Sequence, residues 1–229
     1  NQGDLTTLLT SQRTLYSIRI SVYAASIAVT LAMLIGIPTA YALSRFDFPG
    51  KHLTDLILEL PMVISPAAVG AIILFFFNTK LGIYFQNNVH QVVFTFYGIV
   101  LAQFTTILGI TVRMIKNGFD EVSPRYEKIA RSLGANAWQA IMTVTLPLSK
   151  RSLMSSVILS WAKAMGEFGA TITVAGTMAM KTETLPIAIY MRLSSADING
   201  AAGLIFILLL TGLGSLLIVR GLTRGKLRD

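Results

Sequence analysis

Long apolar runs separated by short polar segments dominate the sequence. Five runs are long enough for the roughly 20 residues that a helix needs to cross the hydrocarbon core of a bilayer; they cover residues 20–43, 56–77, 92–112, 153–177 and 201–219. None shows the alternation of a transmembrane β-barrel strand. In lipid, a helix satisfies every backbone amide within its own segment. The pattern predicts an all-α, polytopic transmembrane helical bundle with five visible spans, forming one domain over residues 1–229.

The composition agrees with a chain whose main solvent is lipid. Only 13% of the residues are charged and 53% are hydrophobic, whereas a soluble domain carries about 25% charged residues. The net charge of +8 is not gathered on an aromatic-interleaved face, so nucleic acid is not an expected partner. Cysteine is absent and His52 and His90 are isolated. We therefore expect no disulfide, no metal site and no cofactor.

Lysine and arginine are distributed unevenly over the predicted loops. Counting them along the five spans places 13 on one side and 5 on the other, with Lys163 inside a span. The positive-inside rule then predicts a multi-pass protein of the cell membrane with a cytoplasmic C-terminus and residue 1 outside. The sequence starts at Asn1 without a Met or a signal peptide. A sixth helix upstream would explain an outside N-terminus.

The connection between the third and fourth runs carries helix signals of its own. Ser123 is suited to cap a helix, Pro124 to its first position and Glu127 to its first turn. Gly134 closes that helix, and residues 135–142 can form a second short one. The connection is predicted to be a pair of short helices at the cytoplasmic membrane surface, placed to be contacted by a partner.

This connection resembles the cytoplasmic "EAA" loop of ABC importer permeases. That family's pattern is an acid and two alanines, a glycine, nine residues, then Ile-x-Leu-Pro. Here the string is Glu127-Lys128-Ile129-Ala130-Arg131-Ser132-Leu133-Gly134, then nine residues, then Val144-Thr145-Leu146-Pro147. Ile129 stands where the first alanine is usual, and the acid lies one residue further from the glycine. An ordinary surface helix pair that ends at a proline is the alternative.

The resemblance implies that residues 117–149 form a coupling loop whose second helix enters a groove on a partner ATPase. Gly134 would allow the turn between its helices, and Ala130 a close approach. The residues that it assigns to this contact are Glu127, Ala130, Arg131, Gly134, Ala135, Asn136, Ala137, Trp138, Ile141, Leu146 and Pro147.

Further stretches narrow the resemblance to the molybdate, tungstate and sulfate permeases, and favour molybdate or tungstate. They are residues 48–51, 60–66, 69–70, 166–173 and 181–190. The resemblance implies a type I importer permease fold and a homodimer of permeases. It also implies two cytoplasmic ATPase subunits and an external oxyanion-binding protein.

Two charged residues interrupt the fourth run. Lys163 and Glu167 are four apart on a helix, and charges within a span face the bundle interior and often pair. One hypothesis places Glu167 at a gate or hinge beside Gly166 and Gly169. The other is an ion pair between Lys163 and Glu167 that holds the bundle together.

Prolines and small polar residues mark candidate pathway positions. Pro61 and Pro66 should kink the second span, either as a moving element or as a static bend. Gln103, Ser160 and Thr171 lie in apolar runs. They are candidates for the gate or pathway, although such residues also serve helix packing.

No catalytic motif was found. The phosphate loop Gly-x-x-x-x-Gly-Lys-Ser/Thr does not occur, so ATP would be used by a separate subunit. The sequence therefore predicts a transport subunit that is not itself an enzyme, and the resemblance implies that it moves a tetrahedral oxyanion by alternating access. A sulfate or thiosulfate permease is the alternative within this class. A stand-alone secondary transporter and a membrane scaffold without transport are the alternatives outside it.

Overall fold

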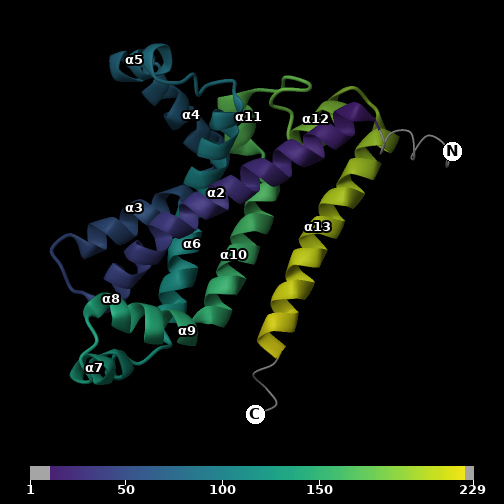
Figure 1. Ribbon diagram of the computed structural model, residues 1–229. Coiled ribbons are helices and arrows are strands. Elements are labelled where there is room, and N and C mark those ends of the chain that lie inside the picture. The colour runs from purple at the N-terminus through teal and green to yellow at the C-terminus, as the bar shows by residue number, and fades with distance from the viewer. Residues whose placement is uncertain (1–10, 225–229) are drawn as a thin grey trace.

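The computed structural model describes residues 11–224, and every regular element within that range is a helix (Figure 1). The predicted all-α class is confirmed. Asn1, and Lys226 and Arg228 of the basic tail, lie outside the described residues. The elements are α2 (Gln12–Arg45), α3 (Lys51–Val63), α4 (Pro66–Phe77), α5 (Lys80–Asn88), α6 (Phe96–Asp120), α7 (Pro124–Ser132), α8 (Ala137–Ala140), the π-helix η1 (Ile141–Thr145), α9 (Leu146–Leu148), α10 (Lys150–Met165), α11 (Gly169–Ala175), α12 (Leu185–Ser194) and α13 (Ile198–Arg224).

The centre of the bundle is the contact between α2 and α6. Small residues of α2 are fully buried there and pack against larger aliphatic side chains of α6, because alanine lets two helices approach closely. The α2 residues are Ala24, Ala25, Ala28 and Ala32, and those of α6 are Ile99, Val100 and Ile107. Helix α10 packs on both. Helix α13 packs on α10 and α12 and leaves most of its apolar side chains exposed.

Three helices are long and apolar enough to cross a membrane by length and composition: α2, α6 and Ile198–Ile218 of α13. Helix α2 has 34 residues, about 51 Å at about 1.5 Å per residue, against a hydrocarbon core of about 30 Å. It runs obliquely across the other helices (Figure 1).

The predicted second span is broken into two helices. Residues 56–77 are divided between α3 and α4, which meet at 113°. Helix α3 continues through Pro61, and the break falls just after it. Ser65 is extended there, accepts the amide of Ala68 and precedes Pro66, so a new helix begins. The structure therefore places the bend at Pro66 rather than at both prolines.

The predicted fourth span is also broken. Residues 153–177 are divided between α10, which ends at Met165, and α11, which begins at Gly169. Helix α10 has only 16 residues, fewer than the roughly 20 that a continuous span needs. The described residues contain three helices of spanning length, or four if α3 and α4 form one broken span. Hydropathy detects apolar runs but not the local backbone geometry that interrupts them.

Candidate functional site

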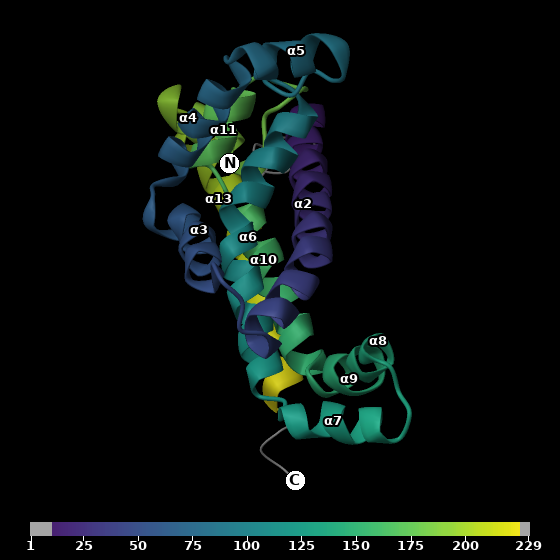
Figure 2. The ribbon, with the colours of Figure 1, turned by 90° about the vertical axis from the view of Figure 1, so that its left-hand side faces the viewer.

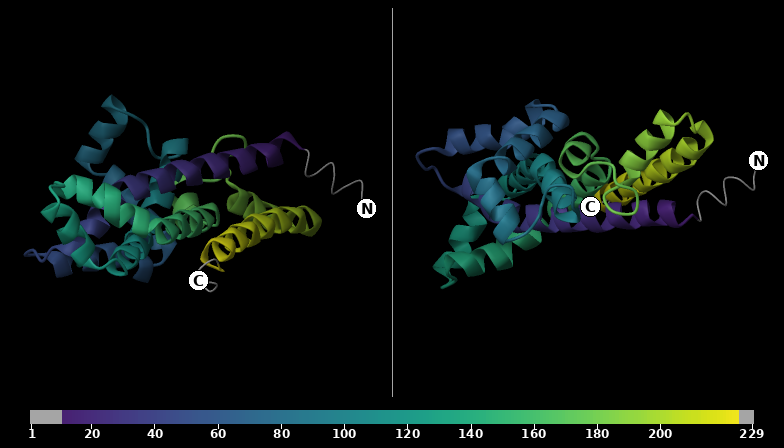
Figure 3. Two further views of the ribbon diagram at one scale, coloured as in Figure 1. Left: turned by 60° about the horizontal axis from the view of Figure 1, so that its bottom comes forward. Right: turned by 90° about the horizontal axis from the view of Figure 1, so that it is seen from above.

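The segment between α6 and α10 projects from one end of the bundle. Helices α7, α8 and α9 lie together there, at the same end as the last described turn of α13, while α5 and the start of α2 lie at the other end (Figures 1 and 2). Figure 3 shows α7 on the side of the molecule away from α12 and α13. We call residues 117–149 the coupling segment.

The first helix of the coupling segment forms as its sequence predicts. Ser123 accepts the amide of Arg125 and Pro124 takes the first helical position. The helix ends at Ser132, and Gly134 follows with a φ of +97°. A Cβ at Gly134 would have nothing within 4 Å. The glycine is therefore needed for its backbone conformation and not for space.

The second helix begins at a capping box and is distorted further on. Asn136 accepts the amide of Gln139, and Gln139 accepts the amide of Asn136, each at 2.8 Å. The helix continues to Leu148, but Ile141–Thr145 is π-helical. Pro147 lacks the amide that an α-helix would pair with the Thr143 carbonyl. The predicted second helix is present and extends past the predicted end at residue 142.

Most residues of the coupling segment face outward. Trp138 is 65% exposed and Leu133 is 85% exposed, with Tyr126 and Ile129 also more than half exposed. Of the residues predicted to contact an ATPase, Glu127 is buried and the others are exposed or partly exposed. Large apolar side chains grouped on a projecting, polar segment are typical of a protein–protein contact.

Glu127 points inward to a cluster of partners that the sequence analysis did not find. Its Oε1 accepts the Arg45 Nε at 2.8 Å and the Thr145 hydroxyl at 2.6 Å, and its Oε2 accepts the Tyr41 hydroxyl at 2.8 Å. The side chains of Arg45 and Glu127 are only 7% and 10% exposed. We call Tyr41, Arg45, Glu127 and Thr145 the anchor cluster.

The anchor cluster connects four elements. Arg45 also donates to the backbone carbonyls of Phe119 and Val122, at 3.0 and 2.8 Å. The end of α2, the end of α6, α7 and η1 therefore share one network. The partners of Glu127 are 82, 86 and 18 residues away. From the sequence alone, Arg45 could be interpreted only as a residue at the end of a membrane span.

Hydrogen bonding keeps Glu127 ionised despite its burial. Burial alone would raise the pKa of this carboxyl group, but hydrogen bonds from Thr145, Arg45 and Tyr41, together with the Arg45 charge, hold the pKa below its usual value. At neutral pH the cluster is therefore a buried ion pair in which both Glu127 oxygens accept hydrogen bonds. Such a pair fixes geometry strongly, since removing either partner leaves the other charge uncompensated.

Glu167 occupies the break between α10 and α11. It is buried, and its Oε1 accepts the amide of Ala170 at 3.0 Å, so it caps the start of α11. No ion pair joins it to Lys163 in the described part of the chain. The hypothesis of a Lys163–Glu167 ion pair is wrong, because the helix that would have put them four residues apart on one face ends at Met165.

The other predicted pathway residues do not form one site. Ser160 is buried and shares a 2.7 Å hydrogen bond with Thr111 of α6, which is a helix-packing contact. Gln103 and Thr171 are also buried, and the Gln103 Oε1 and Thr171 Oγ1 have no hydrogen-bond partner. They lie on α6 and α11, which pack together.

Helices α11 and α4 cross at very short range. A Cβ at Gly70 would lie 2.8 Å from the Thr173 Cβ, and one at Gly169 would lie 3.1 Å from the Pro66 Cβ. A side chain at Gly70 would force its neighbours to move, so glycine suits this crossing. Pro66 is therefore part of this crossing, because it begins α4 and α4 packs against the start of α11.

Comparison with known proteins identifies a family and several related permeases. Residues 28–227 match the family model described as "Binding-protein-dependent transport system inner membrane component". The chain is 34% identical over 220 residues to the molybdenum transport system permease protein ModB of Escherichia coli strain K12, covering 93% of each chain. It is 31% identical to the sulfate transport system permease protein CysT of the same organism, over 90% of this chain and 75% of that one.

One more permease and two solved transporters also match the chain. The chain is 30% identical to the molybdate/tungstate transport system permease protein WtpB of Thermococcus kodakarensis, over 92% of this chain and 79% of the relative. Its fold is similar to that of a bacterial alginate ABC transporter solved with an alginate pentasaccharide-bound periplasmic protein. That likeness has a TM-score of 0.71 at 15% identity and covers 97% of this chain and 81% of the other. The inward-facing MetNI methionine ABC transporter matches at a TM-score of 0.63 and 14% identity, over 93% of this chain and 100% of the other.

Proposed function

The chain belongs to the family of binding-protein-dependent transport system inner membrane components, as an importer permease of the oxyanion group, and we propose that it carries molybdate or tungstate into the cell. ModB aligns over 93% of both chains. The sulfate permease CysT is about as similar, so sulfate or thiosulfate is the second candidate cargo. The energy for transport would come from ATP used by a separate ATPase subunit.

The coupling segment is proposed to bind that ATPase. The observation that carries this is its two-sided construction: Trp138 and Leu133 face outward, while Glu127 is held inside by Arg45. A partner bound to the outer face would therefore transmit force to α2 and α6 through the buried ion pair. The full assembly proposed is a homodimer of this permease with two ATPase subunits and an external oxyanion-binding protein.

The proposed orientation puts the coupling segment in the cytoplasm. The end of the bundle that carries it also holds the cationic residues Arg45, Lys128 and Arg151, which favours the cytoplasmic side. The C-terminal end of α13 would then be cytoplasmic and residue 1 outside.

Alternating access would be driven by closure of the ATPase dimer. The helix that starts at Asn136 would transmit this closure to the bundle. The crossing of α4 and α11, with Glu167 at the preceding break, is proposed as the moving outer gate, and Gln103 and Thr171 beneath it as pathway residues. A short helix that is joined by a capped break can shift as a unit more easily than the middle of a continuous span.

Gly134→Val tests the coupling assignment. A valine at a φ of +97° is strained by about 1–2 kcal/mol or more, so the turn between α7 and α8 should distort. We expect ATPase co-purification and ATP-dependent uptake to fall sharply while membrane insertion persists. Gly50→Val is the matched control, because Gly50 has a φ of +93° with nothing within 4 Å and lies outside the coupling segment.

Normal ATPase binding and full uptake in Gly134→Val would contradict the assignment. Uptake of labelled molybdate with its binding protein, in competition with tungstate, sulfate and thiosulfate, identifies the cargo. A permease that moves solute with no ATPase present would instead support the stand-alone carrier.

A further inference from the structure

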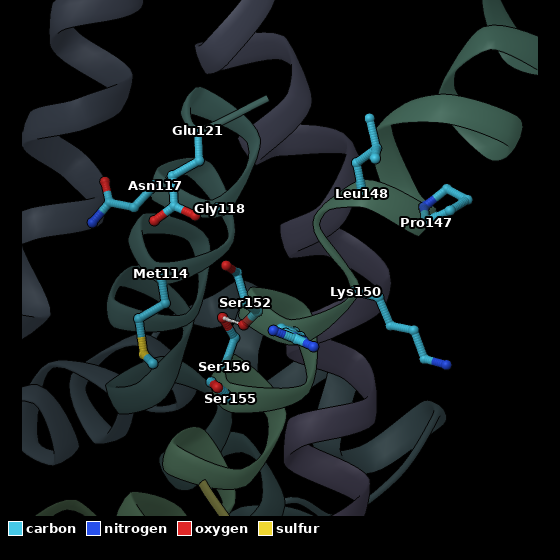
Figure 4. A pocket seen from close by; sticks show the side chains of 11 residues that line it. Met114, Asn117, Gly118, Glu121, Pro147, Leu148, Lys150, Ser152, Ser155 and Ser156 are labelled. Atoms are coloured by element: carbon cyan, nitrogen blue, oxygen red, sulfur yellow. Dashed lines mark hydrogen bonds between the residues drawn. The ribbon is translucent and has the colours of Figure 1, made fainter. Parts of the chain in front are cut away.

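An open cavity of about 640 Å³ lies beside the coupling segment, between the end of α6 and the start of α10 (Figure 4). Its α6 wall is Met114, Asn117, Gly118 and Glu121, and its other wall is formed by residues 147–156. None of these residues belongs to the anchor cluster. The cavity is much larger than a bare tetrahedral oxyanion, so such an ion would fit with part of its hydration shell.

The cavity opens on the face of α6 opposite α2. Ile115 and Phe119 of α6 pack into the cluster with Ala40 and Leu43 of α2, whereas Met114 lies on the other side. The cavity therefore lies at the coupling end of α6, away from its contact with α2 there.

Hydrogen-bond donors without partners line the cavity. Within residues 11–224, no hydrogen bond or ion pair involves the side chains of Lys150, Arg151, Asn117, Ser152 or Ser155. The Ser155 Oγ is buried and unsatisfied. Arg45, Lys51 and Lys116 have carboxylate partners, whereas the exposed α7 cations Arg125, Lys128 and Arg131, like Lys150 and Arg151, have none within residues 11–224. Buried polar groups without partners are uncommon, and a ligand or ion is one explanation.

The balance of charge favours a weakly held anion. Lys150 and Arg151 contribute two positive charges and Glu121 one negative charge. The start of α10 adds the positive end of a 16-residue helix that no side chain caps. Net attraction tempered by one carboxylate suits a site that an ion must both enter and leave.

We propose that this cavity is a low-affinity site for a tetrahedral oxyanion at the cytoplasmic end of the transport route. The proposal rests on the proposed function, since it takes the cargo class from there. Lys150 and Arg151 attract the ion, and Ser152, Ser155 and Asn117 donate hydrogen bonds to its oxygens. Glu121 limits the affinity and so speeds release.

The absence of cysteine from the chain allows a direct test. Met114→Cys places one thiol in the cavity without removing a donor. The full-length chain in phosphatidylcholine nanodiscs is labelled with anionic or cationic methanethiosulfonate reagents of similar size, with added sulfate or molybdate, or with chloride at equal ionic strength. We expect millimolar sulfate and molybdate to slow the labelling, and chloride not to do so.

Charge variants show whether the named residues are responsible. Lys150→Gln with Arg151→Gln should remove the protection and lower the anionic-to-cationic rate ratio about fivefold, as expected for two nearby charges in partly screened solvent. Arg125→Gln with Lys128→Gln changes the net charge equally on α7, outside the cavity, and should leave the protection and the rate ratio unchanged. Glu121→Gln should strengthen protection, the opposite direction from damage to the fold.

Three results would overturn the proposal: no protection by either oxyanion, protection that survives loss of Lys150 and Arg151, or protection that appears only with anionic lipid. Uptake by the assembled transporter is measured separately. If the transporter takes up oxyanion but the oxyanion does not protect Met114→Cys from labelling, this site is refuted and the proposed function is not. Protection without ATP-dependent uptake refutes the proposed function and leaves an anion site.

Discussion

Glu127→Gln is the most informative perturbation of the anchor cluster, because it changes charge while nearly preserving shape. The glutamine oxygen can replace Oε1, which accepts Arg45 and Thr145. Its amide can donate to the Tyr41 hydroxyl. What is lost is the negative charge beside Arg45, whose side chain is 7% exposed. The variant therefore isolates the ionic contribution to docking of α7.

The expected magnitude follows from the burial of the pair. Removing one partner of a buried ion pair costs about 3–5 kcal/mol. Arg45 keeps two backbone carbonyl acceptors, those of Phe119 and Val122, so the cost should fall near about 3 kcal/mol. This is roughly a hundredfold increase in the population with α7 undocked. Tyr41→Phe removes one hydroxyl and should cost about 1 kcal/mol.

Hydrogen exchange of the protein in nanodiscs measures this population directly. We expect backbone amides of α7 and η1 to exchange roughly a hundredfold faster in Glu127→Gln, at about 3 kcal/mol, and amides of the α2–α6 core to be unchanged. Tryptic cleavage at the exposed Arg125 and Lys128 should rise in parallel. Equal exchange of α7 in Glu127→Gln and the parent protein at neutral pH would refute the reasoning.

The pH dependence has a definite sign. The pKa of Glu127 is lowered in the folded protein, so its contribution is fully present above the unfolded pKa of about 4.3 and is lost as the pH falls through the lower folded pKa. The parent protein should therefore loosen at α7 only on strong acidification. Glu127→Gln should lack that transition, and a parent protein whose α7 docking changes near neutral pH would contradict the assignment.

Two further variants test other contacts. Gly70→Val places a branched side chain where a Cβ already lies 2.8 Å from Thr173; overpacking of about 1–3 kcal/mol should speed exchange in α11, whereas Gly212→Val, with nothing within 4 Å, should not. Glu183→Gln weakens the 2.6 Å ion pair between Glu183 and Arg13, whose side chains are 1% and 50% exposed, respectively. Because Arg13 can be rehydrated, thermal stability should fall by only about 1–3 kcal/mol, and no fall would contradict a role in holding α2.

Much of the coupling segment was predictable because its signals are local. Ser123, Pro124 and Gly134 act through the backbone within a few residues, and the structure places α7 and its turn where they indicate. The same holds for α2, α6 and α13, whose apolar runs exceed the length of a span. Such features depend on propensity and hydropathy, which are properties of the chain itself.

The amino-acid pattern alone was enough to predict that the chain is helical, that it lies in a membrane and where the turn after α7 falls. Three features became known only from the packed helices: α3 and α4 meet at 113°, Glu167 caps a helix instead of pairing with Lys163, and Glu127 faces inward to Arg45. The reason is physical: a carboxylate takes whichever donors the packed helices bring to it. Two of the three donors to Glu127, Tyr41 and Arg45, come from more than 80 residues away, at positions that local periodicity does not record.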